Sequence, residues 1–371
     1  MNKMLKPIIA GKRMKCIPGK IIKLVLLIFV FSILNFNAHS RVITVNSGDD
    51  LNSVLNNTVL GDTVWVKPGI YSKIYLKGKK FTKKHPLVIK ASDSGEVIIK
   101  GDTVSSGSSL EILECSYVAL EGFTLTNSMW GIYVKNSDHI ILKSNHIFYT
   151  GQEGCHVGRS SKYVDVIGNE IHNTGLFNPK WAEGVYIGSG SYSGRNTFPD
   201  NCEYIWIEDN HIYETGKAEG INVKGECFHV TVKNNTIHDI HPGTSEQYNQ
   251  AAITVEGTGS SIRHKYRVNE KRDVWVENNT IKNVSGGYSD WNNGIMFFGT
   301  GVYILNNTIS ACKNRGIYGN NYENPGLENF VFGNQISDCG RLSDIHTELK
   351  VNTGKPGKNP HAPQSWYGGE R

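Results

Sequence analysis

The sequence predicts an all-β fold, a single-stranded right-handed parallel β-helix with a helical cap at its N-terminal end. Three observations lead to this prediction. A segment of alternating apolar and polar residues followed by an asparagine recurs along the chain, a second short strand lies between successive copies, and a short amphipathic segment precedes them all. In such a solenoid each repeat forms one coil, and stacked coils bury their apolar faces against one another.

The recurring segment is clearest when its copies are aligned on the asparagine, as in HIILKSNHIFYTG (139–151) and YIWIEDNHIYETG (204–216). Period-two alternation is typical of strands, and an asparagine after a strand is typical of a tight bend. We therefore expect the asparagines to stack as a ladder. They are spaced 24, 41, 25, 44, 28 and 27 residues apart, at Asn145, Asn169, Asn210, Asn235, Asn279, Asn307 and Asn334.

The second strand has a common form, seen in GVYIG (184–188) and GINVK (220–224). Each coil therefore contains at least two strands with a turn of fixed form between them. The segment DDLNSVLNNT (49–58) has the pattern of a short amphipathic helix. We expect this helix to cover the first open coil, because a solenoid needs a cap at its end.

Three parts are expected along the chain: a signal peptide over 1–40, the β-helix domain over 41–340 and a polar C-terminal tail over 341–371. The first part carries seven Lys or Arg and no acid, then the 11-residue apolar run LVLLIFVFSIL, then Ala38-His39-Ser40. This pattern is typical of a signal peptide, and the run is too short for a membrane span. We therefore expect a protein that is secreted or periplasmic.

The charge balance bears on possible partners. The formal net charge is +5, and removing the seven cations of the signal peptide leaves −2 for the mature chain. A nucleic-acid partner requires a basic surface, so this class of partner is not expected. We expect a monomer.

Stacking places the residue before each second strand in one column. Neighbouring strands lie about 4.8 Å apart, so three adjacent carboxylates repel one another unless a cation lies among them. Glu153, Glu183 and Glu219 are therefore predicted to bind Ca²⁺, a hard cation that takes oxygen ligands. The full column reads Trp130, Glu153, Glu183, Glu219, Ala251, Asn293 and Arg315.

The outward positions of the same strands form two further columns. One reads Tyr133, His156, Tyr186, Asn222, Thr254, Met296 and Tyr318; the next reads Lys135, Gly158, Gly188, Lys224, Glu256, Phe298 and Asn320. Polar and aromatic groups thus gather over the coils that carry the glutamates, which predicts a shallow, ligand-sized groove. The candidate substrate-binding residues are Tyr133, Lys135, Arg159, Trp181, Asn222 and Glu256.

The segment AEGINVKGECFHVTVKNNTI (218–237) resembles part of the chondroitinase B and alginate lyase family. In that family a glutamate five residues before a lysine helps to bind calcium, and the lysine is the base. Glu219 and Lys224 have this spacing. The stretch GDTVWVKPGIY (61–71) also resembles the family's opening coils. The resemblance implies a lyase that acts on an acidic polysaccharide. The arginine that the family carries in the following coil would come from SSIRHKYR (260–267), which contains Arg263, His264 and Arg267, or its role would fall to His156 or Tyr186.

Such a lyase removes the C5 proton of a uronate and expels the substituent on O4. Lys224 is the expected base, and we expect calcium and partial burial to lower the pKa of its amine toward the working pH. The acid that protonates O4 is Tyr186, His156 or an arginine. The calcium ion is expected to bind the uronate carboxylate and so make the C5 proton removable.

Other functions remain open. A glycoside hydrolase would use two carboxylates, Glu183 with Glu219 or Glu153. A uronate epimerase would share the proton abstraction and leave the polymer uncut, and a binding β-helix would do neither. The fold does not identify the polysaccharide, which could be pectate, alginate, dermatan or another uronate.

Overall fold

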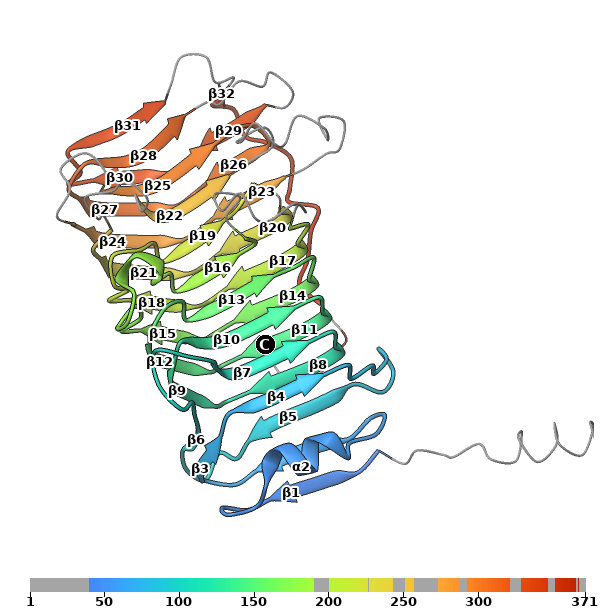
Figure 1. The fold of residues 1–371 in the computed structure, drawn as a ribbon. Helices are drawn as coiled ribbons and strands as arrows, with labels where there is room; N and C mark the ends of the chain where they lie inside the picture. The colour runs from blue at the N-terminus through green and yellow to red at the C-terminus, as the bar shows by residue number, and fades with distance from the viewer. Residues whose placement is uncertain are drawn as a thin grey trace, which may run out of the picture. The chain divides into compact units, whose positions relative to one another are not determined.

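The computed structural model describes residues 40–189, 200–225, 227–242, 251–256, 273–286, 292–320, 328–345, 351–364 and 366. The predicted signal peptide up to residue 39 lies outside the described residues. Residues 40–371 form a unit of their own. Within the described part of this unit, strands follow one another in a repeating order of three and build three parallel sheets, which confirms the predicted parallel β-helix (Figure 1).

Sheet A is the longest of the three, with 12 described strands. It begins at β1 and gains one strand from each coil. Its strands are β1 (Val42–Val45), β2 (Thr63–Val66), β5 (Leu87–Ala91), β8 (Ser116–Glu121), β11 (Asp138–Lys143), β14 (Lys162–Ile167), β17 (Glu203–Glu208), β20 (Phe228–Lys233), β23 (Val274–Glu277), β26 (Val302–Leu305), β29 (Asn329–Phe332) and β32 (Val351–Asn352).

Sheet B follows sheet A in each coil, after the turn that contains the repeated asparagine. The sequence pattern did not separate its short strands from the preceding ones. They are β3 (Gly69–Ser72), β6 (Val97–Lys100), β9 (Thr124–Ser128), β12 (His146–Thr150), β15 (Glu170–His172), β18 (His211–Tyr213), β21 (Thr236–Ile240), β24 (Thr280–Val284), β27 (Thr308–Cys312) and β30 (Gln335–Ser337).

Sheet C contains the strands of the Gly-Ile-x-Val type and completes each coil. Its strands are β4 (Ile74–Lys77), β7 (Ser108–Leu113), β10 (Trp130–Lys135), β13 (Cys155–Gly158), β16 (Val185–Ile187), β19 (Ile221–Val223), β22 (Ala251–Glu256), β25 (Asn293–Phe298), β28 (Arg315–Asn320) and β31 (Arg341–Ile345). Alternate residues of all three sheets point inward, and the core is a continuous column of Val, Ile and Leu.

The predicted asparagine ladder is present at the turn between sheets A and B. Each asparagine donates its side-chain and backbone N–H groups to the side-chain oxygen of the next one, as Asn210 does to Asn235 at 2.9 and 3.0 Å. The residue before each ladder asparagine has a positive φ, for example 56° at Asp209 and 55° at Asn234. The ladder satisfies polar groups that the tight turn would otherwise bury without partners.

The predicted N-terminal cap is the helix α2 (Leu51–Asn56). The side chain of Asp50 accepts a hydrogen bond from Ser53 N at 3.1 Å, which is the usual way to satisfy a free N–H at a helix start. Leu51 and Leu55 are buried in the core. The cap therefore covers the apolar end of the first coil, as Figure 1 shows.

The C-terminal segment lies along sheet A. Strand pairing continues past residue 340, because β31 pairs with β28 and β32 with β29. Residues 353–364 then run back over the outer face of sheet A (Figure 1). His361 Nε2 lies 2.8 Å from Asp273 Oδ2, and Gln364 N donates to Asp165 Oδ2 at 2.8 Å. None of the helices within the described residues has the length and apolar character needed to cross a membrane.

Candidate functional site on sheet C

The predicted columns of sheet C are present in the predicted register. Tyr133 pairs with His156, His156 with Tyr186, Tyr186 with Asn222, and Asn222 with Thr254. The same register brings Glu153, Glu183 and Glu219 into neighbouring coils, because Gly154 N donates to Glu183 O at 2.9 Å and Gly184 N to Glu219 O at 3.2 Å. Residues as far apart along the chain as Tyr133 and Thr254 therefore share one wall of the solenoid.

The three glutamates are buried, with exposed fractions of 7% for Glu153, 3% for Glu183 and 1% for Glu219. Trp130 Nε1 donates to Glu153 Oε2 at 2.7 Å, and Thr254 Oγ1 donates to Glu219 Oε1 at 3.0 Å. Among the described residues Glu183 Oε2 has no hydrogen-bond partner. The middle carboxylate thus has an oxygen available for a ligand.

Burial raises the pKa of Glu183 well above its ordinary value, and the charges of Glu153 and Glu219 raise it further. Two species relieve this repulsion: a proton on Glu183, or a bound cation. A buried carboxylate oxygen without a partner, beside two further carboxylates, is a suitable donor set for a hard cation such as Ca²⁺.

The carboxylates of Glu153, Glu183 and Glu219 do not converge on a single metal-binding position. Two groups of acidic and histidine side chains among the described residues bring ligand atoms within 4.8 Å of one another, His146–Glu170–His172 and His229–Asp273–His361. The three glutamates are not among them. A cation held by all three would require their side chains to rotate from these positions.

Lys224 lies beside the glutamates and is paired with Glu256 of the next coil. Its Nζ lies 3.2 Å from Glu256 Oε1 and 5.6 Å from the centre of the Tyr186 ring. Burial by itself lowers the pKa of Lys224, but the neighbouring acidic groups, Glu256 above all, outweigh it and raise the pKa above its ordinary value. This shift is opposite to the one expected from the sequence, because the carboxylates around the amine favour its charged form.

Aromatic rings form a continuous row of tilted and edge-to-face contacts beside these charges. Centroid distances are 5.1 Å from Trp130 to Tyr133, 4.6 Å from Tyr133 to His156 and 4.8 Å from His156 to Tyr186. Burial also raises the pKa of Tyr186. The two ring nitrogens of His156 face Gly188 O at 3.0 Å and Glu153 Oε1 at 3.5 Å.

The first coils of this wall carry a second lysine. Lys135 Nζ lies 3.6 Å from Glu111 Oε1 and 3.6 Å from the centre of the Tyr133 ring. Burial lowers the pKa of Lys135. Burial raises the pKa of Tyr133 to about 12, against the lowering effect of Arg159. The predicted residues Tyr133, Lys135 and Arg159 therefore lie together.

The other predicted residues are more scattered. Trp181 lies on the 3₁₀ helix η1 (Pro179–Trp181) and is 57% exposed, whereas Asn222 is 2% exposed in the middle of the wall. Among the described residues, Asn222 Oδ1 has no hydrogen-bond partner. Arg263 lies outside the described residues.

Asp200 is a residue that sequence reasoning missed. It is 4% exposed and accepts hydrogen bonds from Arg159 N at 2.7 Å and Ser160 N at 2.9 Å. It therefore holds the turn after β13, directly beyond His156. An aspartate at the end of a Gly/Ser-rich insertion is a common turn signal, and this signal could have identified it.

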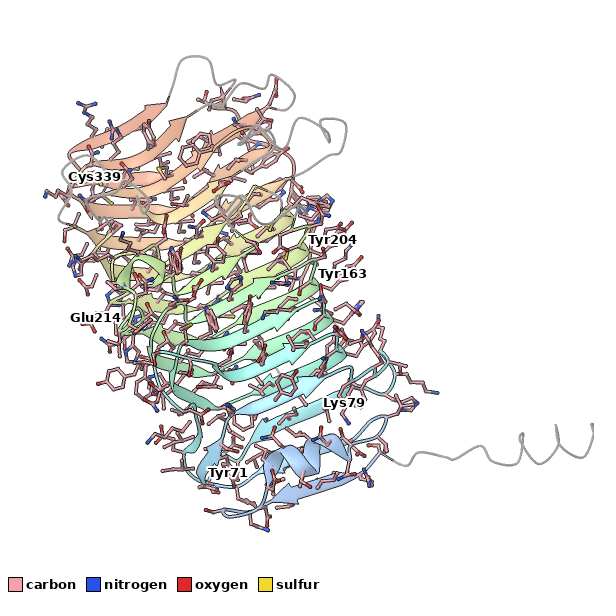
Figure 2. All side chains as sticks on the ribbon, viewed as in Figure 1. Tyr71, Lys79, Tyr163, Tyr204, Glu214 and Cys339 are labelled. Carbon is pink, nitrogen blue, oxygen red and sulfur yellow. The ribbon has the colours of Figure 1, made fainter. Side chains whose placement is uncertain are left out.

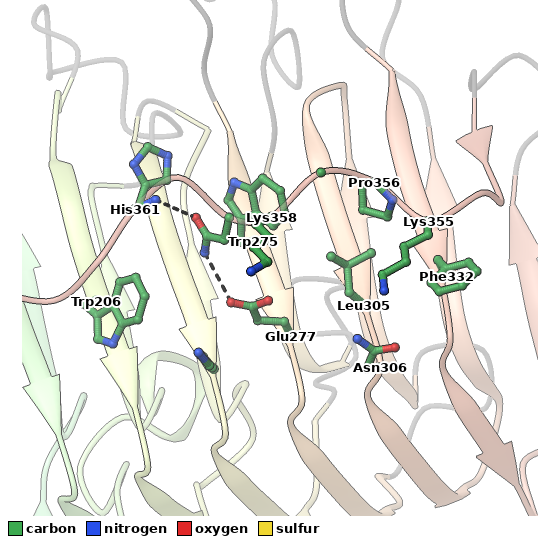
Figure 3. Close-up of a pocket in the computed structure, with 13 residues that line it drawn as sticks. Trp206, Trp275, Glu277, Leu305, Asn306, Phe332, Lys355, Pro356, Lys358 and His361 are labelled. Carbon is green, nitrogen blue, oxygen red and sulfur yellow. Dashed lines mark hydrogen bonds between the residues drawn. The ribbon is translucent and has the colours of Figure 1, made fainter. Parts of the chain in front are cut away.

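A pocket of about 410 Å³ lies on a different face, between sheet A and the C-terminal segment (Figure 3). Trp206 and Trp275 line it from the sheet, and Asn359 bridges it by donating to Glu277 Oε1 at 3.3 Å. The sequence did not predict this pocket, because it depends on where the tail runs.

Comparisons with known proteins agree with this architecture. The sequence matches the profile of the family described as "Right handed beta helix region" over residues 35–267. No curated protein matches the chain.

Solved structures share the fold at low sequence identity. An alginate lyase from Paenibacillus sp. str. FPU-7 is 20% identical, with 84% of this chain and 99% of that chain covered and a TM-score of 0.66. A rhamnogalacturonan lyase is 14% identical, with 84% and 87% covered and a TM-score of 0.61. The catalytic unit of a GH87 α-1,3-glucanase from Streptomyces thermodiastaticus strain HF3-3 is 15% identical, with 86% and 68% covered and a TM-score of 0.50.

Proposed function

The chain belongs to the right-handed β-helix family, and we propose that it is an exported lyase that cleaves a uronic-acid-containing polysaccharide by β-elimination. One observation carries the proposal: Lys224 and Tyr186, from adjacent coils, lie side by side above buried carboxylates. β-Elimination needs a base in reach of the C5 proton and an acid in reach of O4, both held close to a group that balances the uronate's charge. The fold shared with an alginate lyase and a rhamnogalacturonan lyase is compatible with this class.

The proposed reaction uses two proton transfers. Lys224 Nζ takes the C5 proton, the electron pair of the C5–H bond forms the C4=C5 double bond, and the C4–O4 bond breaks. The leaving O4 receives a proton from the hydroxyl of Tyr186, or from His156 or Arg263 in its place. Atoms and charges balance without water, and the product carries an unsaturated sugar at its new end.

Glu153, Glu183 and Glu219 are the residues that would hold Ca²⁺. When bound, such an ion polarises the uronate carboxylate and makes the C5 proton more acidic. The donor set suits it because all three groups offer oxygen and Glu183 Oε2 lacks a partner among the described residues.

The charge around Lys224 sets a condition on its role. Its amine accepts a proton only in the neutral form, and the neighbouring carboxylates favour the charged form. A cation bound to Glu219 and Glu183 would offset their charge, and the pKa of Lys224 would then fall toward the working pH. The proposal that Lys224 is the base therefore requires a cation bound at the glutamates.

The surrounding residues would bind the polysaccharide. Lys135 and Arg159 provide positive charge for a neighbouring uronate, and Tyr133 and the exposed Trp181 provide faces on which sugar rings can stack. Asn222 lies two residues before Lys224 in the same coil and Glu256 lies beside Lys224 in the next coil, and both offer hydrogen bonds to hydroxyl groups. We infer from the signal-peptide pattern over 1–40 that the protein is exported. We also infer that it is a monomer and that it has no nucleic-acid partner.

A hydrolase is the second candidate, and one observation favours it. The raised pKa of Glu183 is a property of carboxylic acids that protonate leaving groups, and Glu153 or Glu219 would then serve as the second carboxylate. The fold likeness to an α-1,3-glucanase is equally compatible with that chemistry. Epimerization would use Lys224 in the same way without cleavage, and a non-catalytic glycan-binding β-helix would need neither acid nor base.

Product analysis separates these functions. Mature protein is incubated with pectate, alginate, dermatan sulfate and other uronates, with Ca²⁺ or with a chelator. We expect unsaturated ends that absorb in the ultraviolet from at least one polymer, formed with Ca²⁺ and lost with the chelator. Reducing ends without unsaturation would instead identify a hydrolase, deuterium uptake at C5 without cleavage an epimerase, and binding without any product a glycan-binding protein.

A further inference from the structure

A cluster of imidazoles and a carboxylate lies on the outer face of sheet B, away from the sheet C wall. In this sheet β12 pairs with β15, so His146 lies opposite Glu170 and Phe148 opposite His172. His146 and His172 are therefore diagonal neighbours, with Glu170 beside both. The two rings are tilted by 33° with their centres 5.0 Å apart.

The two rings face each other through their Nε2 atoms. These atoms are 2.8 Å apart, so at most one of them carries a hydrogen in this contact. His172 Nδ1 lies 2.6 Å from Asn173 Oδ1, and Asn173 Nδ2 donates to Glu214 Oε2 at 2.9 Å. The second contact fixes the Asn173 amide with its oxygen toward His172. His172 Nδ1 therefore carries the hydrogen, and Nε2 presents a lone pair.

This arrangement is the one that orients histidine as a metal ligand, with the far ring nitrogen donating to an oxygen. Figure 2 labels Glu214, the outer member of this chain of contacts, on the opposite side of the view from Tyr163 and Tyr204 of sheet A. The His172–Asn173–Glu214 chain belongs to the sheet B side of the coils, whereas the described part of the C-terminal segment contacts sheet A.

Glu170 supplies the third ligand. Tyr213 donates its hydroxyl hydrogen to Glu170 Oε1 at 2.8 Å, which holds the carboxylate in place, and within the described residues no hydrogen bond to Oε2 is formed. The ligand atoms of His146, Glu170 and His172 all lie within 4.8 Å of one another. All three side chains are partly exposed, so an ion can enter and water can complete its coordination.

We propose that His146, Glu170 and His172 form a binding site for one divalent transition-metal ion, with Zn²⁺ as the ion it takes. Two imidazole nitrogens and one carboxylate oxygen are ligands typical of zinc, which leaves one tetrahedral position for water. The ion would tie two neighbouring coils together, because His146 comes from β12 and the other two ligands from β15. This site is independent of the proposed lyase chemistry, and its nitrogen ligands distinguish it from the all-oxygen calcium site.

A second histidine pair on the same sheet provides a matched control. His211 Nε2 lies 2.7 Å from His238 Nε2, and His238 Nδ1 lies 2.7 Å from Asp239 Oδ2. Among the described residues, this pair does not form a three-ligand group within 4.8 Å. Replacing His238 removes a contact between two imidazole rings, as replacing His146 or His172 does, but it removes no proposed metal ligand.

Zinc titration tests the proposal. Untagged mature protein is stripped with a chelator, and ZnCl₂ is titrated by calorimetry at pH 7.5. We expect one site per chain with a dissociation constant below about 10 μM, and affinity at least ten-fold weaker in His146→Ala, His172→Ala and the isosteric Glu170→Gln. His238→Ala should bind Zn²⁺ like the wild type, and circular dichroism without metal checks that each variant is folded.

A second readout is thermal. Zn²⁺ at 100 μM should raise the Tm of the wild type and of His238→Ala, because a ligand of the native state stabilises it, and should leave Glu170→Gln nearly unchanged. Three results would overturn the proposal: no zinc binding tighter than 100 μM, equal affinity in wild type and Glu170→Gln, or an equal loss in His238→Ala.

Discussion

Lys224 Nζ lies 3.2 Å from Glu256 Oε1 although 32 residues separate them along the chain. The contact arises because β19 and β22 are adjacent strands of sheet C, paired from Ile221 with Ile253 to Val223 with Val255. The carboxylate keeps the lysine charged, so this pair controls the pH at which Lys224 could act as a base.

Replacing Glu256 should therefore move the pH dependence of activity. Glu256→Gln removes the charge that most strongly raises the pKa of Lys224, so the pKa falls. A base works in its deprotonated form, and the acidic limb of the kcat/KM profile should shift to lower pH. The control is Glu111→Gln, which breaks the equivalent pair with Lys135 and should leave that limb in place. An unmoved limb in Glu256→Gln would argue against Lys224 as the titrating group.

Glu183 should make the metal-free protein less stable as the pH rises. Its folded pKa lies above the unfolded value of about 4.3, so the native state holds the extra proton and stability falls as pH rises through this window. Glu183→Gln, a neutral mimic, should have a Tm higher by on the order of 2 °C at pH 8 in chelator, with the difference vanishing near pH 4.

Calcium should reverse the order of the Tm values of the wild type and Glu183→Gln. Adding Ca²⁺ should raise the Tm of the wild type more than that of Glu183→Gln, because the variant lacks one of the proposed charged ligands. Glu328→Gln, at an exposed position, serves as the control. An equal response to calcium in all three proteins would show that Glu183 does not bind the ion.

The asparagine ladder should contribute strongly to stability. Asn235 accepts from Asn210 and donates to Asn279 Oδ1 at 2.9 Å and to Ile207 O at 3.0 Å. Asn235→Ala leaves buried donors and acceptors in two coils without partners, which should lower the free energy of unfolding by about 3 kcal/mol. Denaturant unfolding measures this, with the exposed Thr236→Ala as control. A loss below about 0.5 kcal/mol would mean that water replaces the ladder.

The C-terminal segment should detach when its anchor is removed. Burial raises the pKa of Asp273, but hydrogen bonds from His229, His361 and Trp275 outweigh it and hold the pKa well below its ordinary value. This contribution is fully present above the unfolded pKa of about 3.9 and is lost as the pH falls below it.

Asp273→Asn should consequently lower the Tm at pH 7 and have progressively less effect toward pH 3. Proteolysis at pH 7 offers a second measurement, because the chain should be cut by trypsin after Lys358 faster in this variant. Glu214→Gln, on sheet B, should be cut like the wild type. A constant Tm difference from pH 7 to pH 3 would contradict the assigned role of the carboxylate charge.

The sequence predicted the stacked columns because strand periodicity and the repeated asparagine determine the register. Tyr133, His156, Tyr186 and Asn222 were aligned by counting residues, and the structure has the same pairs. The direction of the Lys224 pKa shift was not predictable in this way. It depends on the position of the Glu256 carboxylate relative to the amine, which the register alone does not determine.

Two other features were missed for different reasons. The C-terminal segment has no periodicity, and its position depends on single contacts such as His361 with Asp273. The histidine cluster did leave a signal, because His146, Glu170 and His172 occupy the first or third position after a ladder asparagine. Alignment of the residues after the asparagine would have placed them in neighbouring columns of sheet B.

The most direct test of the central claim is the kcat/KM of Lys224→Arg on the polysaccharide that yields unsaturated ends. Arginine keeps the positive charge opposite Glu256 but does not give up its proton to become a base. If Lys224 removes the C5 proton, kcat/KM should fall by about 10²–10⁴-fold while the variant still binds the polymer. A kcat/KM within about three-fold of the wild type would contradict this account, because charge alone would then explain the role of Lys224.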